Sequence, residues 1–386
     1  AAMVSGLDRL VFANTGSDAR FILVILRGGM DGLAAVPAYT ESAYGQLRGS
    51  LALGSPGTSG GVLDLDGFFG LHPELKNMHS LYRQKELLVA HAVASSYRDR
   101  SHFDGQKQLE NGTNSPLGAQ DGWLNRALSL MPSSRMDAIA LSQNIPLILY
   151  GDAKVNSWSP PVLPEADADT ITRIARMYEG DSFFSSQFDS ALRTRAMAED
   201  LLDGGMNRGR RARGNQNMEV SVKAAGRFLK DINGPRIAVL ESSGWDTHAN
   251  QGAGNGQLAN KFAQLDTGLN LLKRELGGVW KNTVVMVASE FGRTVAVNGS
   301  NGTDHGTANA VFILGGAVNG GKVISDWPGL SRPKLYEGRD LKPTMDIRSL
   351  FKSLLHDHLQ VASEPLEKII FPNSNKAGKI PDLLVS

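Results

Sequence analysis

The apolar run Phe21-Ile22-Leu23-Val24-Ile25-Leu26 leads directly into Arg27-Gly28-Gly29-Met30-Asp31-Gly32, and this stretch decides the fold. The six apolar residues are continuous rather than alternating, which is typical of a strand buried on both faces of a sheet. The glycines then allow a tight turn that presents Asp31 at the edge of the sheet. A carboxylate there either binds a hard cation or caps the next helix, and both roles stay open.

Five further apolar runs have the same continuous character. They are Leu87 to Val93, Pro146 to Tyr150, Arg236 to Leu240, Thr283 to Ala288 and Ala310 to Leu314. Helical patterns lie between them, the clearest from Leu258 to Leu276. Strands that alternate with helices predict an α/β fold, with a mostly parallel central sheet covered by helices on both faces. Ligands of such sheets bind beyond the carboxyl ends of the strands, so the residues there are the candidates for chemistry.

Residues 152–215 differ in character from the rest of the chain. A polar helical pattern runs from Ile171 to Asp203, and a loop with four arginines follows: Arg208, Arg210, Arg211 and Arg213. We expect a helical insertion or cap here, within one α/β domain that spans residues 1–386. The arginines are either part of a solvated loop or an anion-binding cluster. A last helix is predicted from Met345 to Leu359.

The composition excludes several classes of function. Lys and Arg number 40 against 39 Asp and Glu, so the net charge of +1 does not attract nucleic acid or an anionic membrane. No apolar run reaches the roughly 18 residues of a membrane span. The absence of cysteine excludes disulfides and thiolate chemistry, and it suits an oxidising compartment. The first residues look like the flank of a removed signal peptide, and we expect a periplasmic or secreted protein.

A hydroxyl, an imidazole and a carboxylate follow the second apolar run within four residues, at Ser101, His102 and Asp104, beside Arg98 and Arg100. Ser101 is either the N-cap of a helix or a nucleophile at a helix N-terminus. In the second case the backbone N–H groups and the arginines attract an anionic substrate group. Ser101 and His102 do not form a catalytic triad by adjacency, because neighbouring side chains in an extended segment point apart.

Two acid–histidine pairs lie near later strands. Asp246 and His248 follow the fourth run at a spacing that is usual for zinc, manganese or iron ligands. Asp304 and His305 lie in a glycine-rich turn, either as a metal or catalytic pair or as an Asx-type turn with an exposed histidine. Glu290 ends the fifth run, where a buried carboxylate must be paired or coordinated. One sheet edge would gather these residues together with Asp31 and Ser101.

Six motifs resemble a large bacterial family known as domain of unknown function 1501, over nearly the whole chain. They are Leu26–Leu33, Arg100–Asp104, Asp121–Arg126, Gly244–His248, Ser289–Thr294 and Gly302–Gly306. The resemblance implies a twin-arginine export signal and, often, a partner protein encoded nearby. The family is similar to a distant branch of the alkaline phosphatase and sulfatase superfamily, which implies an alkaline-phosphatase-like fold.

That superfamily holds two metal ions at the carboxyl edge of a parallel sheet. The resemblance makes Asp31, Asp246, His248, Glu290, Asp304 and His305 the candidate metal ligands. Ser101, His102, Arg100 and Arg293 are the candidate catalytic residues. The chain departs from the superfamily at Glu290 and Phe291, where an Asp and a histidine ligand are expected. We therefore expect one ion, held by Asp246, His248 and His305, rather than two.

The expected function is that of a metal-dependent hydrolase of phosphate or sulfate esters, acting on an anionic small molecule or a polysaccharide. The divalent metal is expected to be zinc, with manganese, calcium or magnesium as alternatives. Arg27, Arg98, Arg100 and Arg293 are expected to clamp the anion, because a guanidinium fork matches phosphate or sulfate oxygens. The alternative is a non-catalytic exported protein that keeps the fold and binds a polysaccharide, peptide or protein partner. A metal-using transferase or isomerase is a third.

Overall fold

The computed structural model describes residues 18–131, 138–160, 168–178 and 215–385, with a few residues between 180 and 194. A nine-stranded sheet has the order β10-β4-β9-β8-β1-β7-β5-β6, with β11 beside β4. The strands are β1 Arg20–Arg27, β4 Leu87–Ala94, β5 Ala138–Ala140, β6 Val155–Ser157, β7 Ile237–Ser243, β8 Thr283–Ser289, β9 Asn309–Leu314, β10 Lys322–Ile324 and β11 Met345–Asp346. Two short strands, β2 (Leu63–Asp64) and β3 (Gly70–Leu71), pair separately.

All strands of the large sheet but β9 run in one direction. β1 is parallel to β7 and β8, whereas β9 is antiparallel to both of its neighbours, β4 and β8. β9 therefore begins at the edge where β1, β4, β7 and β8 end, which we call the carboxyl edge. The loop 290–308 leaves the sheet and returns to it on this same edge.

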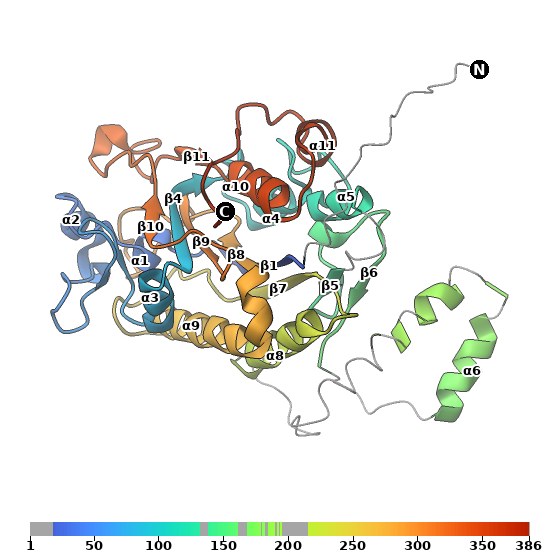
Figure 1. Cartoon of the computed structure of the whole chain (residues 1–386). Helices are drawn as coiled ribbons and strands as arrows, with labels where there is room; N and C mark the ends of the chain where they lie inside the picture. The colour runs from blue at the N-terminus through green and yellow to red at the C-terminus, as the bar shows by residue number, and fades with distance from the viewer. Residues whose placement is uncertain are drawn as a thin grey trace, which may run out of the picture.

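Helices cover both faces of the sheet (Figure 1). One face carries α3 (Lys76–Arg83), α8 (Asn215–Lys230) and α9 (Gln257–Leu276), and the other carries α4 (His102–Asn111), α5 (Trp123–Ser129) and α10 (Ile347–Ser353). Along β1, Ile22, Val24 and Leu26 enter the first core and Phe21, Leu23 and Ile25 the second, because alternate side chains of a strand point to opposite faces. The predicted α/β fold is confirmed.

The remaining helical segments do not belong to the two helical layers named above. The α-helices are α1 (Gly32–Ala35), α2 (Tyr44–Arg48), α6 (Ala168–Tyr178) and α11 (Ser363–Pro365). 3₁₀ segments lie at Gly49–Leu51, Leu147–Leu149, Gly277–Asn282 and Arg332–Lys334, and π-helical turns at Leu354–His358 and Leu366–Ile370. None of the described helices combines the length and the apolar character that crossing a membrane requires.

The strand predicted at Pro146 to Tyr150 is wrong, because Leu147–Leu149 form a 3₁₀ turn. Gly122 N donates to the Tyr150 carbonyl at 2.9 Å, and Asn125 Nδ2 donates to the Leu149 carbonyl at 2.8 Å. The start of α5 thus satisfies the backbone of this apolar run, and the sheet does not. Hydrophobicity predicted that the run is buried, but it does not distinguish a buried strand from a buried turn.

The two predicted helices and the predicted insertion agree with the structure to different extents. The helix from Leu258 to Leu276 is confirmed as α9. The helix predicted from Met345 begins later, because Met345–Asp346 pair with β4 and Asp346 caps α10 through Arg348 N at 2.9 Å. In the expected insertion 152–215, α6 is helical. The arginine cluster 208–213 and the first 17 residues lie outside the described residues.

Candidate metal centre

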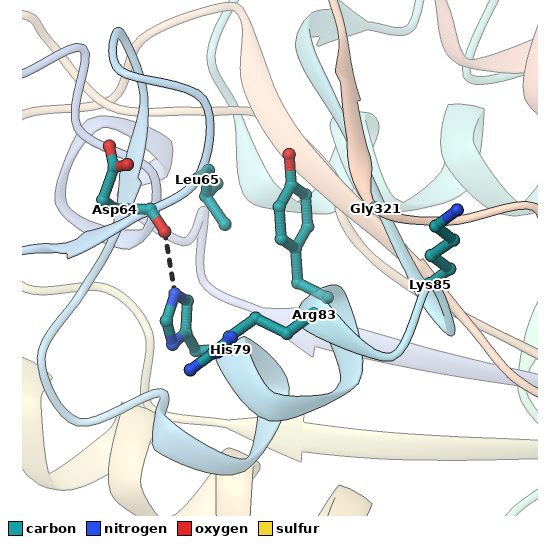
Figure 2. Close-up of a pocket in the computed structure, with 7 residues that line it drawn as sticks. Asp64, Leu65, His79, Arg83, Lys85 and Gly321 are labelled. Atoms are coloured by element: carbon teal, nitrogen blue, oxygen red, sulfur yellow. Dashed lines mark hydrogen bonds between the residues drawn. The ribbon is translucent and has the colours of Figure 1, made fainter.

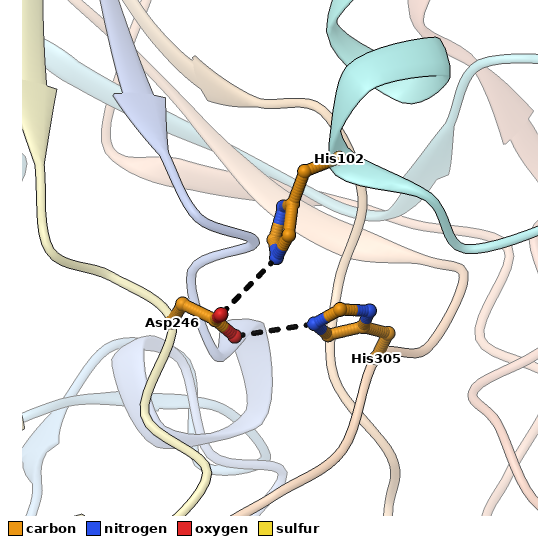
Figure 3. A group of neighbouring side chains, drawn as sticks. All are labelled: His102, Asp246 and His305. Atoms are coloured by element: carbon orange, nitrogen blue, oxygen red, sulfur yellow. Dashed lines mark hydrogen bonds and ion pairs between the residues drawn. The ribbon is translucent and has the colours of Figure 1, made fainter.

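Three side chains from separate segments meet at the carboxyl edge (Figure 3). They are His102 at the start of α4, Asp246 after β7 and His305 before β9, and one potential ligand atom from each lies within 4.8 Å of the others. Asp246 Oδ2 lies 3.4 Å from His102 Nε2, and Asp246 Oδ1 lies 3.2 Å from His305 Nε2. Residues far apart in the chain thus place nitrogen and oxygen donors in one small volume.

His248 adds a fourth side chain to this cluster. Its Nε2 atom lies 2.9 Å from Asp246 Oδ1 and 2.9 Å from His305 Nε2. We call His102, Asp246, His248 and His305 the edge cluster. Its three imidazoles all turn their Nε2 atoms toward the single carboxylate.

Each imidazole of the edge cluster is held from behind through its Nδ1 atom. Nδ1 of His102 lies 2.8 Å from Glu290 Oε1, and Nδ1 of His305 lies 2.8 Å from the backbone oxygen of Arg100. Nδ1 of His248 lies 3.3 Å from Asp304 Oδ1. Carbonyl oxygens and ionised carboxylates only accept hydrogen bonds, so each Nδ1 carries a proton. In the neutral rings, the Nε2 lone pairs then face Asp246 and one another.

This arrangement fits a divalent metal ion. His102 Nε2 is buried and has no hydrogen-bond partner among the described residues. Converging lone pairs repel one another unless a cation or a shared proton lies between them. Imidazole nitrogens with a carboxylate oxygen are a common donor set for zinc. An acceptor on the far ring nitrogen is also the usual device that orients a metal-binding histidine.

Two glycines let the loops approach closely enough to form the edge cluster. Gly28 has φ +121°, and a Cβ atom there would lie only 2.6 Å from the backbone nitrogen of Asp246. A Cβ atom at Gly302 would lie 2.3 Å from the backbone carbonyl carbon of His248. Any larger residue would displace the backbone that carries Asp246 or His248. The glycines of two sequence motifs therefore serve the geometry of the cluster.

Neighbouring charges set the protonation of the edge cluster. The buried Arg293 donates from Nη1 to Asp246 Oδ1 at 2.6 Å. Partial burial opposes ionisation of Asp246, but Arg293 outweighs it and lowers the pKa of this carboxyl. The hydrogen bond from His102 to Glu290 raises the pKa of His102, whereas burial lowers the pKa of His305. Asp246 is thus an anionic centre among basic nitrogens.

The structure brings together only part of the predicted site. Asp246, His248 and His305 converge, whereas Glu290 and Asp304 lie behind His102 and His248 and contact them through Nδ1. His102, predicted from the sequence as a catalytic residue, lies among the potential metal-ligand atoms, a place that the sequence did not predict. Its position at a helix start after a strand was the only signal, and that signal was equally compatible with both roles.

Asp31, a predicted metal ligand, is bonded elsewhere. Its Oδ1 caps α1 by accepting from Leu33 N at 3.1 Å and Ala34 N at 3.2 Å. Its Oδ2 pairs with the buried Arg48 and accepts from Gln251 Nε2 at 2.7 Å. The guanidinium takes the place that a cation would need, so the capping role is the one that the structure shows. Nothing in the sequence pattern pointed to Arg48.

The arginines expected to clamp an anion already have partners within the protein. The partners are Glu110 and Glu241 for Arg27, the backbone carbonyls of Ser95 and Tyr97 for Arg98, Glu337 and Asp340 for Arg100, and Asp246 for Arg293. Their charges are therefore largely used in holding the loops around the edge cluster. These contacts compete with the predicted role of Arg27, Arg98, Arg100 and Arg293 as an anion clamp, which stays a prediction.

Ser101 lies at the N-cap position of α4, but its side chain does not cap the helix. Among the described residues, its hydroxyl has no hydrogen-bond partner. The residues on either side of it both touch the edge cluster: Arg100 through its backbone oxygen and His102 through its imidazole. The Ser101 hydroxyl thus makes no hydrogen bond among the described residues, and Ser101 directly precedes His102, one of the potential metal ligands, in the chain.

A separate pocket of about 390 Å³ lies away from the edge cluster (Figure 2). It is lined by Asp64, Leu65, His79, Tyr82, Arg83, Lys85 and Gly321. Lys85 lies two residues before the start of β4, and Gly321 directly precedes β10, so the pocket lies at the opposite, amino edge of the sheet. It contributes no residue to the candidate metal centre.

Comparison with known proteins gives two kinds of similarity. Among solved structures, the chain is similar to Ps i-CgsB in complex with k-i-k-neocarrahexaose, with 11% identity, 94% of this chain and 77% of that chain covered, and a TM-score of 0.46. It is similar to a phosphonate monoester hydrolase of Agrobacterium radiobacter, with 12% identity, 89% and 74% covered, and a TM-score of 0.38. It is also similar to a protein in the alkaline phosphatase superfamily from Vibrio parahaemolyticus, with 11% identity, 87% and 65% covered, and a TM-score of 0.40.

No curated protein matches the sequence. The model of a family described as protein of unknown function (DUF1501) matches residues 88–370, which is most of the chain. The predicted family resemblance is confirmed, and the protein belongs to the DUF1501 family.

Proposed function

We propose that this chain is an exported, metal-dependent hydrolase of phosphate or sulfate esters. One observation carries the proposal: three imidazole Nε2 atoms converge on the Asp246 carboxylate, those of His102 and His305 being drawn in Figure 3, and each ring is held from behind by an acceptor on Nδ1. A purely structural cluster would pair these nitrogens with donors, as buried polar groups usually are. The cluster also lies at the carboxyl edge of the sheet, which is where parallel sheets bind their ligands.

His102, Asp246 and His305 would hold the ion, with His248 as a fourth donor, and this set suits zinc best. When bound there, a divalent cation supplies Lewis acidity toward an ester oxygen. The chain's own residues prepare the site: Arg293 keeps Asp246 ionised, and Glu290 holds the His102 ring in one orientation.

We assign nucleophilic attack to Ser101. Its hydroxyl is unengaged, and the first backbone N–H groups of α4 favour a negatively charged oxygen beside it. The serine oxygen would bond to phosphorus or sulfur, the alcohol would leave, and water would then release the anion and regenerate the serine. The anion clamp is not assigned to Arg100 or Arg293, since both guanidinium groups are paired with carboxylates.

The test is a metal analysis of the purified protein, followed by a screen of aryl phosphate and aryl sulfate esters. We expect bound zinc, turnover of at least one ester class, and loss of both in the variant His305→Ala. The control is His79→Ala, since His79 lies in the pocket at the amino edge. Metal-free protein without turnover, even after zinc is added, would contradict the proposal.

The pairing of the nearby arginines favours a second candidate function. A non-catalytic exported protein would keep the metal centre and use it to bind a polysaccharide or protein partner. Capture of a stoichiometric periplasmic partner whose own activity requires this chain, in the absence of any ester turnover, would favour this candidate over the hydrolase.

A further inference from the structure

A group of cations, three of them without an ion pair among the described residues, lies in a segment that contacts the edge cluster. The segment 331–342 carries four cations, Arg332, Lys334, Arg339 and Lys342, which we call the basic rim. Its two carboxylates, Glu337 and Asp340, are engaged by Arg100, and Asp340 also by Arg339. Arg332, Lys334 and Lys342 are exposed and form no ion pair with any residue that the structure describes.

Contacts with the loop 290–308 attach the basic rim to the metal centre. The Arg339 guanidinium donates to the backbone oxygen of His305. The Arg332 side chain lies 3.8 Å from the position that a Cβ atom at Gly338 would take, and Gly338 directly precedes Arg339 in the chain. Thr307 donates to the Leu341 carbonyl at 2.9 Å. The rim is therefore an extension of the site and not a remote patch.

An exposed aromatic ring directly follows a residue of the same cluster in the chain. Phe103 directly follows His102 in the first turn of α4, and 81% of its surface is exposed. A bare aromatic ring buries apolar surface when the flat C–H face of a sugar ring stacks on it. The side chains of Asp246 and His248 are 39% and 46% exposed, so the cluster opens on a surface on which a long ligand can lie.

We infer that the ligand of this site is a polyanionic sugar chain, whose flanking charges bind the basic rim and one of whose rings stacks on Phe103. The whole chain has a net charge of only +1, so it has no general attraction for polyanions. A local excess of cations at one site selects a ligand that carries charge beyond the reacting group. A small ester would leave both the rim and Phe103 unused.

The inference deepens the proposed function, but binding tests it without catalysis. The full chain, treated with a chelator, is titrated with dextran sulfate oligomers and with uncharged dextran of the same length. We expect binding of dextran sulfate only, weakening with salt. The double charge reversal Arg332→Glu with Lys334→Glu should weaken binding about tenfold, since each exposed pair contributes only a modest energy.

A matched control is available at the other edge of the sheet. Arg83 and Lys85 have the same residue types and the same spacing as Arg332 and Lys334. They are likewise exposed and without an ion pair in the described part of the chain (Figure 2). Arg83→Glu with Lys85→Glu should leave the affinity for dextran sulfate within about twofold of the wild type, because charges more than a Debye length away are screened. Equal losses in the two double variants would overturn the inference.

Phe103 tests the sugar character of the ligand. Phe103→Ala should lower the affinity for dextran sulfate several-fold. The affinity for polyphosphate, which has no ring to stack, should stay unchanged. Polyphosphate that binds as tightly as dextran sulfate, with no effect of Phe103→Ala, would overturn the assignment to sugars. If the binding pattern holds but no ester is turned over, the hydrolase proposal fails and the ligand assignment stands.

Discussion

Two groups of histidines in this protein use their ring nitrogens in opposite ways. In the core, Nε2 of His72 bonds to the Ala253 carbonyl and Nε2 of His91 to the Val36 carbonyl, both at 2.9 Å. Their Nδ1 atoms accept from backbone nitrogens, of Glu74 at 3.1 Å and of Ala92 at 2.8 Å. These rings are fully satisfied by the backbone, so they hold loops in place and have no lone pair left for a ligand.

The edge cluster shows the reverse pattern. His102, His248 and His305 are fixed through Nδ1 by acceptors, and their Nε2 atoms point toward one another and toward Asp246. The comparison teaches that the partner of the far nitrogen, more than burial or proximity, distinguishes a structural histidine from a potential ligand. Substitutions at the carboxyl edge and in the core break or sharpen this comparison.

The largest effect is expected for removal of an edge histidine. His305→Ala should lower zinc affinity by more than the roughly 10- to 100-fold typical of outer-shell partners, because it deletes a donor atom. A chelator should then lower the melting temperature of the wild type but not that of the variant, since metal stabilises only the state that binds it. A chelator-induced shift of equal size in both proteins would show that His305 does not hold the ion.

Asp31→Asn should be costly to stability and neutral for the metal. It leaves the buried Arg48 without its carboxylate, and such unpaired charges cost about 3–5 kcal/mol. Urea unfolding measures this loss, and the double variant Asp31→Asn with Arg48→Met should recover much of it. Asparagine still caps the helix. A folded Asp31→Asn protein that has lost its zinc would place Asp31 among the ligands after all.

Glu290→Gln tests the role of the acceptor behind His102. We expect zinc affinity to fall about 10- to 100-fold, because the carboxylate no longer orients and strengthens this ring. Asp304→Asn should have a smaller effect, since Asp304 is 54% exposed and lies 3.3 Å from His248. Calorimetric titration with zinc measures both. A larger loss for Asp304→Asn would reverse the assigned order of the two acceptors.

The smallest effect concerns the core group. Burial lowers the pKa of His91 from 6.5 to about 4. Between these two pH values, His91 is protonated in the unfolded chain but neutral in the folded protein. This contribution to stability is present above pH 6.5 and is lost as the pH falls toward 4. The free energy of unfolding of metal-free His91→Gln should therefore decline less over this range than that of the metal-free wild type. Parallel pH profiles would contradict this.

The sequence predicted the strands that carry the site because their residues are apolar on both faces, as in β1 and β8. It also predicted that Asp246, His248 and His305 meet, since ends of parallel strands share an edge. It did not predict the Arg48 contact of Asp31 or the pairing of Arg100 with Asp340. Each of these ion pairs depends on the conformation of loops, and no periodic sequence pattern predicts a loop conformation. The short strands β5 and β6 were missed because three residues are too few to show a period.

The most direct test of the account is anomalous diffraction at the zinc absorption edge, from crystals of the full chain grown with zinc. We expect one strong peak in contact with Asp246 and the Nε2 atoms of His102 and His305, and no peak there in His305→Ala. A peak beside Asp31 instead, or none at the carboxyl edge of the sheet, would contradict it.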